Sequence, residues 1–252
     1  MTGLSALVTG GGGDLGAAIA RRAAAAGYRV CVVDRDAERA QRVAAELPGA
    51  MGMACDVTDE GAVNAVLDAF GAVPDLVANN AGIGVFRSLM DYDVADFRRV
   101  IDVNLIGCFI VARAAARRMA KRGSGCIVNI TSIAAIVPNA GAGAYSAAKA
   151  GLARMTEQMA IEWGPLGLRV NAVAPGFIDA GLSTPFYADP AVRASRGAAV
   201  PTRRLGTADD VAQAVMYLSS EAASYVSGHE LVVDGGVVSS LLTQLPRVAA
   251  KS

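Results

Sequence analysis

The sequence has a single histidine, and this scarcity limits the chemistry that the protein can perform. A Ser-His-Asp hydrolase would have to use His229, which precedes an apolar strand and has no nucleophile motif beside it. The four cysteines form no Cys-x-x-Cys pair, so zinc sites and disulfide frameworks are not indicated. We therefore expect no metal, and we interpret the cysteines as small buried residues of a reducing compartment.

Charged residues are also few, and the two signs balance. Lys plus Arg and Asp plus Glu each total 23, which gives the chain no electrostatic reason to bind nucleic acid or an anionic membrane. No stretch approaches the roughly 20 apolar residues of a membrane span. The first ten residues lack the basic region of a signal peptide. We expect a cytoplasmic protein without nucleic-acid or membrane partners.

What the sequence does have is a regular alternation of short apolar runs and alanine-rich helical segments. Strands are predicted at 5–8, 29–33, 50–54, 75–78, 126–130, 168–173 and 230–233. Helices are predicted near 15–26, 37–47, 59–70, 93–121, 145–163 and 208–219. The strands are apolar almost throughout, as in parallel sheets covered on both faces. The pattern predicts one α/β domain over 1–252, a doubly wound (Rossmann-type) parallel sheet of about seven strands with helices on both faces.

The segment 179–205 interrupts this alternation. It contains Pro185, Pro190 and Pro201 and is predicted to be a long loop. Because loops of that length in a compact domain are usually functional, we expect a mobile flap over the substrate.

A glycine-rich turn lies between the first predicted strand and the first helix. Its sequence is Thr9-Gly10-Gly11-Gly12-Gly13-Asp14-Leu15-Gly16. Glycines allow a pyrophosphate to approach the backbone N–H groups, and the helix N-terminus adds a partial positive charge. A plain tight turn would also explain such a run, but the order strand, turn, helix favours a dinucleotide site.

Asp34 ends the second predicted strand, 18 residues after Gly16. A carboxylate there can accept hydrogen bonds from the adenosine ribose and would repel a 2′-phosphate, so we expect NAD, with NADP the less favoured cofactor. Arg35 keeps the alternative open, because its guanidinium could bind the phosphate or lie over the adenine. Asp34 could also be an ordinary turn or helix-capping residue.

Tyr145 and Lys149 are four positions apart on a predicted helix and so share one face. A phenol titrates near pH 10, so its pKa would have to fall by roughly three, or about 4 kcal/mol, to act as a base near neutrality. A cation about 4 Å away contributes on the order of 4 kcal/mol at an effective dielectric constant of 20. Taken alone, the pair could be an exposed surface pair. Ser132 favours a site, because it follows a strand whose carboxyl end would line the ligand crevice.

In this order the motifs resemble those of the classical short-chain dehydrogenase/reductase family, over essentially the whole chain. The matching elements are the glycine-rich turn, Asp56-Val57, Asn79-Asn80-Ala81-Gly82, Asn104, Ser132, Tyr145 with Lys149, Pro175-Gly176-Phe177-Ile178 and Asp234-Gly235-Gly236. The resemblance implies an enzyme that interconverts a small secondary alcohol and a ketone. It also implies a homo-oligomer, commonly a tetramer, with helices near 102–121 and 145–163 at one interface.

The resemblance further implies residue roles. Ser132 would hold the substrate oxygen, Tyr145 would exchange the proton, Lys149 would lower the pKa of the phenol and bind the nicotinamide ribose, and Asn104 would support a proton-relaying water. The implied cofactor set is Gly10, Gly13, Asp14, Leu15, Gly16, Asp34, Arg35, Asp56, Val57, Asn80, Ala81, Gly82, Tyr145, Lys149, Pro175, Gly176 and Ile178. The implied substrate set is Ile133, Asn139, Ala142 and Phe177. Caps and turns are the competing interpretations for Ser132, Asn104 and Asn79-Asn80.

Two positions depart from the family pattern. Asp14 stands where the second glycine of the turn is expected, and we expect it to cap the helix with its side chain turned aside while Gly12 or Gly13 provides the close approach. Ala180 replaces a threonine whose hydroxyl would help to hold the nicotinamide carboxamide. Ser183 or Thr184 could take over that role.

Three functions remain open. The first is an NAD-dependent dehydrogenase of secondary alcohols, the second an NADPH-dependent 3-oxoacyl or polyketide-type ketoreductase supported by Arg35. The third is a non-catalytic NAD-sensing scaffold. The joint presence of Asn104, Ser132, Tyr145 and Lys149 disfavours it.

Overall fold

The predicted strands form a single parallel sheet in the computed structural model, which describes residues 3–240. They are β1 (Ser5–Thr9), β2 (Arg29–Asp34), β3 (Met51–Ala54), β4 (Leu76–Asn79), β5 (Gly125–Ile130), β6 (Leu168–Pro175) and β7 (Glu230–Val233). Their order is β3-β2-β1-β4-β5-β6-β7, with every neighbouring pair parallel. The winding reverses between β1 and β4, where such folds bind ligands outside the carboxyl ends of the strands. The predicted doubly wound fold is confirmed.

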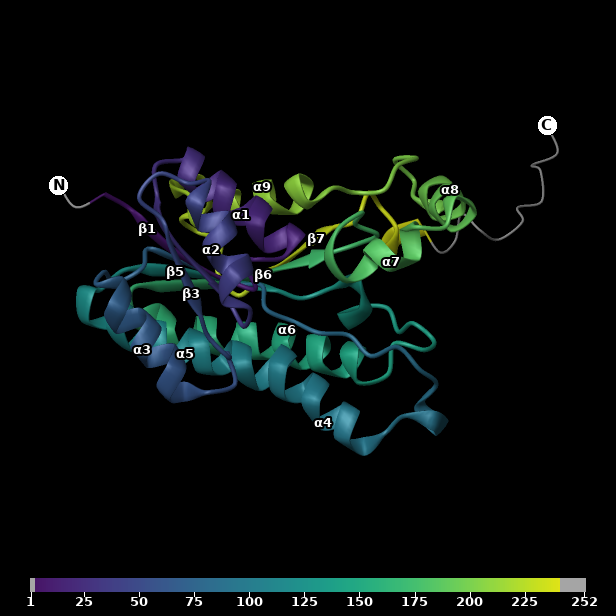
Figure 1. The fold of residues 1–252 in the computed structure, drawn as a ribbon, viewed down its shortest axis with the longest axis horizontal. Coiled ribbons are helices and arrows are strands. Elements are labelled where there is room, and N and C mark those ends of the chain that lie inside the picture. Colours follow the sequence, from purple (N-terminus) through teal and green to yellow (C-terminus); the bar gives the residue numbers. More distant parts are fainter. Residues whose placement is uncertain (1–2, 241–252) are drawn as a thin grey trace.

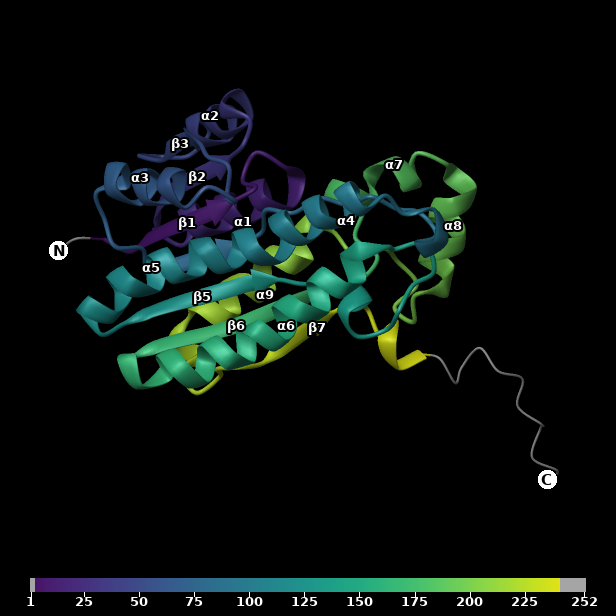
Figure 2. The same ribbon diagram turned by 90° about the horizontal axis from the view of Figure 1, so that it is seen from below.

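Helices cover both faces of the sheet (Figures 1 and 2). On one face lie α1 (Asp14–Ala25), α2 (Ala37–Ala45) and α9 (Ala208–Ser219), and on the other α3 (Glu60–Phe70), α4 (Val94–Ile101), α5 (Cys108–Arg122) and α6 (Ala144–Trp163). Successive strand residues point to opposite faces, so Val8 is buried with Ile19 of α1 whereas Leu7 is buried with Phe70 of α3. Within residues 3–240 no helix is long and apolar enough to cross a membrane.

The helix predicted over 93–121 is not a uniform α-helix. After α4 ends at Ile101, a π-helical stretch covers Asp102–Gly107 before α5 begins at Cys108. The chain stays helical throughout, so the spacing of apolar residues does not reveal the interruption. Such π-stretches frequently mark functional sites, and this one contains Asn104.

The segment predicted to be a flap loop contains two helices instead. They are α7 (Thr184–Tyr187) and α8 (Pro190–Ala199), and they lie beyond the carboxyl edge of the sheet (Figure 1). Asp189 caps α8 by accepting a hydrogen bond from the backbone N–H of Ala191, and Pro190 stands in the first turn. Pro185 and Pro190 therefore lie in the first turns of helices, where the missing N–H costs nothing, whereas Pro201 follows the end of α8 in a turn.

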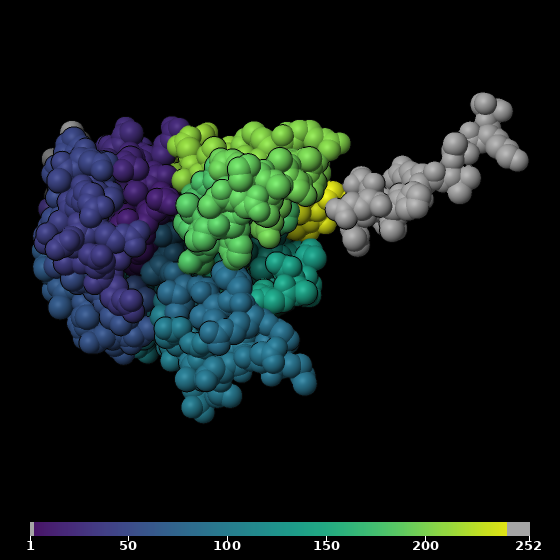
Figure 3. All heavy atoms as spheres, turned by 45° about the vertical axis from the view of Figure 1, so that its right-hand side comes forward, coloured from purple at the N-terminus to yellow at the C-terminus, as the bar shows by residue number. Residues whose placement is uncertain are grey.

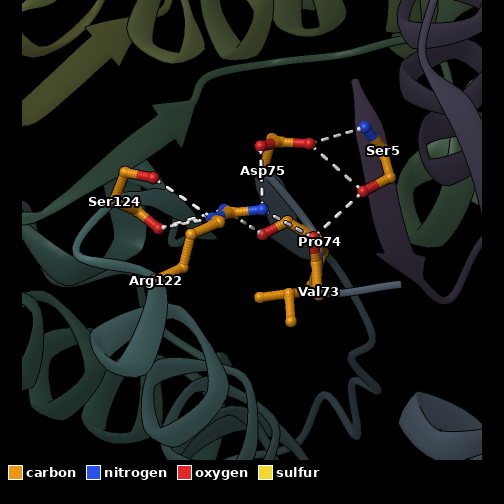
Figure 4. A network of polar contacts seen from close by, with 6 residues as sticks. All are labelled: Ser5, Val73, Pro74, Asp75, Arg122 and Ser124. Carbon is orange, nitrogen blue, oxygen red and sulfur yellow. Dashed lines mark hydrogen bonds and ion pairs between the residues drawn. The ribbon is translucent and has the colours of Figure 1, made fainter. Parts of the chain in front are cut away.

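The opposite edge of the sheet is held by a polar network (Figure 4). Asp75, just before β4, accepts hydrogen bonds from Ser5 at the start of β1 and pairs with Arg122 at a distance of 3.0 Å. Arg122 also donates to the carbonyl oxygens of Val73, Pro74 and Ser124. These contacts fix the amino ends of the central strands, far from the ligand edge.

Candidate active site

All the residues predicted for catalysis, cofactor and substrate border one cleft at the carboxyl edge of the sheet. The cleft has a volume of about 1100 Å³ and extends from the end of β2 to the α7–α8 segment. Figure 3 shows that segment, in green, standing over a recess beside the purple and blue N-terminal half. Because pockets for single small molecules measure about 300–1,000 Å³, this cleft has room for a dinucleotide and a small substrate.

The glycine-rich turn after β1 leaves no space for a Cβ at Gly10 or Gly16. Gly10 has a φ angle of +61°, and a Cβ on it would lie 2.9 Å from the Cα of Ala81. A Cβ on Gly16 would overlap the carbonyl oxygen of Gly10. Asn80 fixes the turn by donating its side-chain N–H to the carbonyls of Thr9 and Gly10, at 3.1 Å each. The N-terminus of α1 behind this turn is a suitable site for a pyrophosphate.

The structure corrects the expectation for Asp14. Its side chain does not cap α1, because Gly13 is the N-cap residue and no side-chain cap bond is present there. Asp14 is turned aside, as predicted, and its Oδ2 accepts a hydrogen bond of 3.0 Å from the backbone N–H of Gly181. Of the two glycines proposed for the close approach, Gly13 lines the cleft, whereas Gly12 packs against Arg39 and Asp34. Asp14 thus links the cofactor turn to the segment before α7.

The end of the cleft beside β2 is lined by the carboxylate of Asp34 and the guanidinium groups of Arg35 and Arg39. Asp34 is half-buried, and its Oδ2 accepts a hydrogen bond of 3.0 Å from the N–H of Gly12. Arg35 and Arg39 are exposed and line the cleft near it. Arg39 is not among the residues predicted for the site, because nothing in the sequence of α2 gives a reason to select it. Asp56 also borders this end, and hydrogen bonds from Thr58 lower its pKa.

A network of buried amides supports the cleft from behind. The side-chain N–H of Asn79 donates to the side-chain oxygen of Asn129 at 2.9 Å and to the carbonyl of Cys108. Asn129 in turn donates to the hydroxyl of Thr156 on α6. The network ties the ends of β4 and β5 to α5 and to α6, the helix that carries Tyr145 and Lys149.

Asn104, Gly82 and Lys149 meet at the floor of the cleft. Asn104 is fully buried, and its side-chain N–H donates to the carbonyls of Ile83 and Val100. Its Oδ1 is buried and finds no hydrogen-bond partner among residues 3–240. A Cβ on Gly82 would lie 2.7 Å from that oxygen and 3.6 Å from the Nζ of Lys149. The absence of a side chain at Gly82 therefore keeps Asn104 and Lys149 open to the cleft.

Ser132, Tyr145 and Lys149 lie together as predicted from the sequence. The hydroxyl of Ser132 lies near enough to the phenol of Tyr145 to lower its pKa by hydrogen bonding, and the Nζ of Lys149 lies 5.7 Å from the centre of the Tyr145 ring. Lys149 is buried, and it donates a hydrogen bond of 2.7 Å to the carbonyl of Ile130 at the end of β5. The backbone of β5 thus fixes the ammonium beside the phenol.

The electrostatics of Tyr145 differ from the expectation. Burial raises the pKa of its phenol to about 12, and only the hydrogen bond with Ser132 opposes this shift. Burial also lowers the pKa of Lys149. In the protein alone the loss of solvation therefore dominates the pKa of the phenol, and the lowering by Lys149 stays a prediction.

The α7–α8 end of the cleft contains the four predicted substrate residues and several that the sequence did not reveal. Ile133, Asn139, Ala142 and Phe177 all line it. The additional lining side chains at this end are Phe86, Arg87, Val137, Leu182, Phe186 and Arg196. Phe86 and Arg87 belong to the loop after β4, Val137 follows a short 3-10 turn after β5, and the other three come from the helical segment 181–199. Of the two substitutes considered for the hydroxyl missing at Ala180, Ser183 lines the cleft and Thr184 does not.

Comparison with known proteins gives concordant matches along the chain. The family model described as enoyl-(acyl carrier protein) reductase matches residues 13–238. The cis-4-hydroxycyclohexanecarboxylate dehydrogenase of Sinomonas cyclohexanicum is 44% identical over 240 residues, covering 92% of this chain and 95% of its own length. The D-threitol dehydrogenase of Mycolicibacterium smegmatis is 36% identical over 244 residues, covering 94% and 93%.

Solved structures agree with these matches. The crystal structure of 3-oxoacyl-[acyl-carrier protein] reductase from Brucella melitensis superposes with a TM-score of 0.89 at 33% sequence identity, covering 93% of this chain and 91% of that one. Fold and sequence therefore lead to the same group of enzymes.

Proposed function

The chain belongs to the classical short-chain dehydrogenase/reductase family, whose nicotinamide-dependent members interconvert alcohols and ketones, and on this premise we propose an NAD-dependent dehydrogenase of secondary alcohols with Tyr145 as the general acid/base. The observation that carries the proposal is the convergence of Ser132, Tyr145 and Lys149 on one cleft. A scaffold that only senses NAD would have no use for this triad.

The residues of the cleft fit a nicotinamide dinucleotide. The turn from Gly10 to Gly16 leaves the N-terminus of α1 open to a pyrophosphate, and Asp34 presents a fixed carboxylate where an adenosine ribose would lie. The buried, unpaired Oδ1 of Asn104 and the space above Gly82 mark the other end. When bound, the oxidised nicotinamide supplies the hydride acceptor and a positive charge near Tyr145.

Four side chains of the cleft then have separate roles in binding the substrate oxygen and moving its proton. Ser132 donates a hydrogen bond from its Oγ to the substrate oxygen, and the Oη of Tyr145 removes the hydroxyl proton in the oxidation or returns it in the reduction. Lys149 stabilises the phenolate, because its ammonium is held beside the ring by Ile130. The Oδ1 of Asn104 holds a water that passes the proton towards solvent. All four roles are compatible with the positions of these atoms.

The test of the cofactor assignment is a comparison of kcat/KM for NAD and NADP with a common alcohol. We expect NAD to be favoured by more than tenfold, because the Asp34 carboxylate repels a 2′-phosphate. Asp34→Asn keeps an oxygen for the N–H of Gly12 but removes the charge, and it should reduce the preference. A parent enzyme that prefers NADP would contradict the assignment.

A second candidate is an NADPH-dependent 3-oxoacyl reductase. It is favoured by Arg35 and Arg39, which flank the adenosine end and could bind a 2′-phosphate, and by the likeness to the Brucella melitensis reductase. The same comparison separates the two, with a 3-oxoacyl thioester as the second substrate.

A further inference from the structure

Arg196 is a half-buried guanidinium that lines the α7–α8 end of the cleft and pairs with no carboxylate of the described residues. It lies on α8, and among residues 3–240 its side chain makes no hydrogen bond and no ion pair. Removing an arginine from water without a partner is costly, so such a group in a binding cleft is suited to a ligand of opposite charge.

The other arginines of this region are satisfied. Arg193, one turn earlier on α8, pairs with Asp179, and Arg204 pairs with Asp210 at 2.7 Å. Arg203 donates to the carbonyl of Ala198. Arg196 differs from these three because it faces the cleft rather than a protein acceptor.

Aromatic rings hold the Arg196 guanidinium in place. Its Cζ lies 5.2 Å from the ring centre of Phe177, 5.7 Å from that of Phe186 and 5.8 Å from that of Tyr187. Contacts with ring faces stabilise the cation, yet they leave the N–H donors of its fork without acceptors. The rings therefore orient the group and do not satisfy it.

The same rings connect Arg196 to the reactive phenol. Phe186 lies 5.5 Å from Phe86, and Phe86 lies 6.0 Å from Tyr145, measured between ring centres. A substrate whose hydroxyl is at Tyr145 would lay its carbon skeleton along Phe86 and Phe186 and bring its far end towards Arg196.

The distribution of charged side chains along the cleft also favours an anionic ligand near Arg196. Its lining carboxylates, Asp14, Asp34 and Asp56, all belong to the nucleotide side, and within the described chain the α7–α8 side contributes only Arg87 and Arg196. Arg87 is exposed and lies 3.7 Å from Asp96, so it is the less available of the two.

We propose that Arg196 binds a carboxylate of the substrate, and hence that this enzyme acts on hydroxy acids whose alcohol and carboxylate are separated by an apolar skeleton. A guanidinium fork matches a carboxylate with two parallel hydrogen bonds, which gives orientation as well as affinity. The inference rests on the proposed alcohol dehydrogenase function and specifies its substrate class.

The experiment compares 4-hydroxycyclohexanecarboxylate with its methyl ester, which has the same ring and hydroxyl but no charge. For the parent we expect kcat/KM to favour the acid by about tenfold or more, mainly through KM, because charged hydrogen bonds contribute more than neutral ones. In Arg196→Met this ratio should fall to near one, and Arg196→Lys should restore part of it. Arg193→Met removes the same charge from the same helix outside the cleft and should keep the parent ratio.

Several results would overturn the inference while leaving the dehydrogenase assignment intact. They are an unchanged ratio in Arg196→Met, a parent that does not distinguish acid from ester, and a loss of the ratio in Arg87→Met instead. A parent that oxidises neither compound nor any other alcohol would contradict the dehydrogenase assignment itself.

A binding measurement keeps the two questions separate. Cyclohexanecarboxylate lacks the hydroxyl and cannot react, so calorimetric titration into the enzyme with NAD reports recognition alone. We expect binding to the parent and to Arg193→Met, and at least tenfold weaker binding to Arg196→Met. Equal binding to all three proteins, or none to the parent, would refute the role of Arg196.

Discussion

At the scale of single residues, the site depends on a phenol that is a weak acid in its own protein. The pKa of Tyr145 is raised to about 12 by burial, and the hydrogen bond with Ser132 is the contact that lowers it. The group expected to activate it, Lys149, is held by the carbonyl of Ile130 with its Nζ 5.7 Å from the centre of the ring. In the proposed mechanism Ser132 therefore has two tasks, holding the substrate and easing ionisation of the phenol.

This dual task predicts a pH signature for Ser132→Ala. Because alcohol oxidation needs the phenolate, kcat/KM should rise with pH in the parent, and ketone reduction should rise as the pH falls. Without the hydroxyl of Ser132 the pKa of Tyr145 goes up, so the rising limb of oxidation should move to higher pH. The maximal rate should also fall by about 10²–10³-fold, the effect of losing one donor to the reacting oxygen.

The matched control is Ser132→Thr, which keeps a hydroxyl and should keep the position of the limb. A profile of Ser132→Ala that is lower but unshifted would mean that Ser132 binds the substrate without acting on Tyr145.

At the scale of elements, the cofactor turn and the α7–α8 segment are joined by one side chain. Asp14 accepts the N–H of Gly181, just before α7, and the same segment carries Phe186 and Arg196 into the cleft. The carboxylate therefore positions the substrate side of the cleft from the cofactor side.

Replacement of Asp14 by glycine tests this connection. We expect KM for the alcohol to rise several-fold, because a hydrogen bond to a charged group near the solvent contributes about 1 kcal/mol or somewhat more. The Kd for NAD, measured by titration, should change by less than tenfold. Asp14→Asn retains an acceptor for Gly181 and should resemble the parent. A tenfold gain in NAD affinity in Asp14→Gly would instead mean that the carboxylate obstructs the pyrophosphate.

The sequence predicted the elements well where their patterns were continuous. Buried parallel strands give unbroken apolar runs, so all seven were located to within one or two residues. The π-helical stretch around Asn104 was missed because it does not break the apolar pattern. The sequence does not predict α8 because Pro190 indicates a loop, although Asp189 followed by a proline is also a helix start.

At the scale of the whole molecule, the stabilising polar network and the candidate site lie at opposite ends of the parallel strands. The Asp75–Arg122 network closes the amino edge, and the cleft opens at the carboxyl edge, where parallel strands deliver their following residues to one place. This is why motifs far apart in the sequence could be assigned to one site.

The direction of the Tyr145 pKa shift and the place of Arg196 could not be predicted, because both depend on packing around a half-buried side chain. The predicted homo-oligomer stays a prediction, to be checked by the mass in solution.

The central claim is that Tyr145 moves the proton in alcohol oxidation. The most direct test is the rate of NADH formation by Tyr145→Phe with the best alcohol at saturating NAD, beside a titration showing that NAD still binds. The account predicts a loss of about 10²–10⁴-fold, the usual contribution of a general acid/base. Oxidation by Tyr145→Phe at the rate of the parent would contradict it.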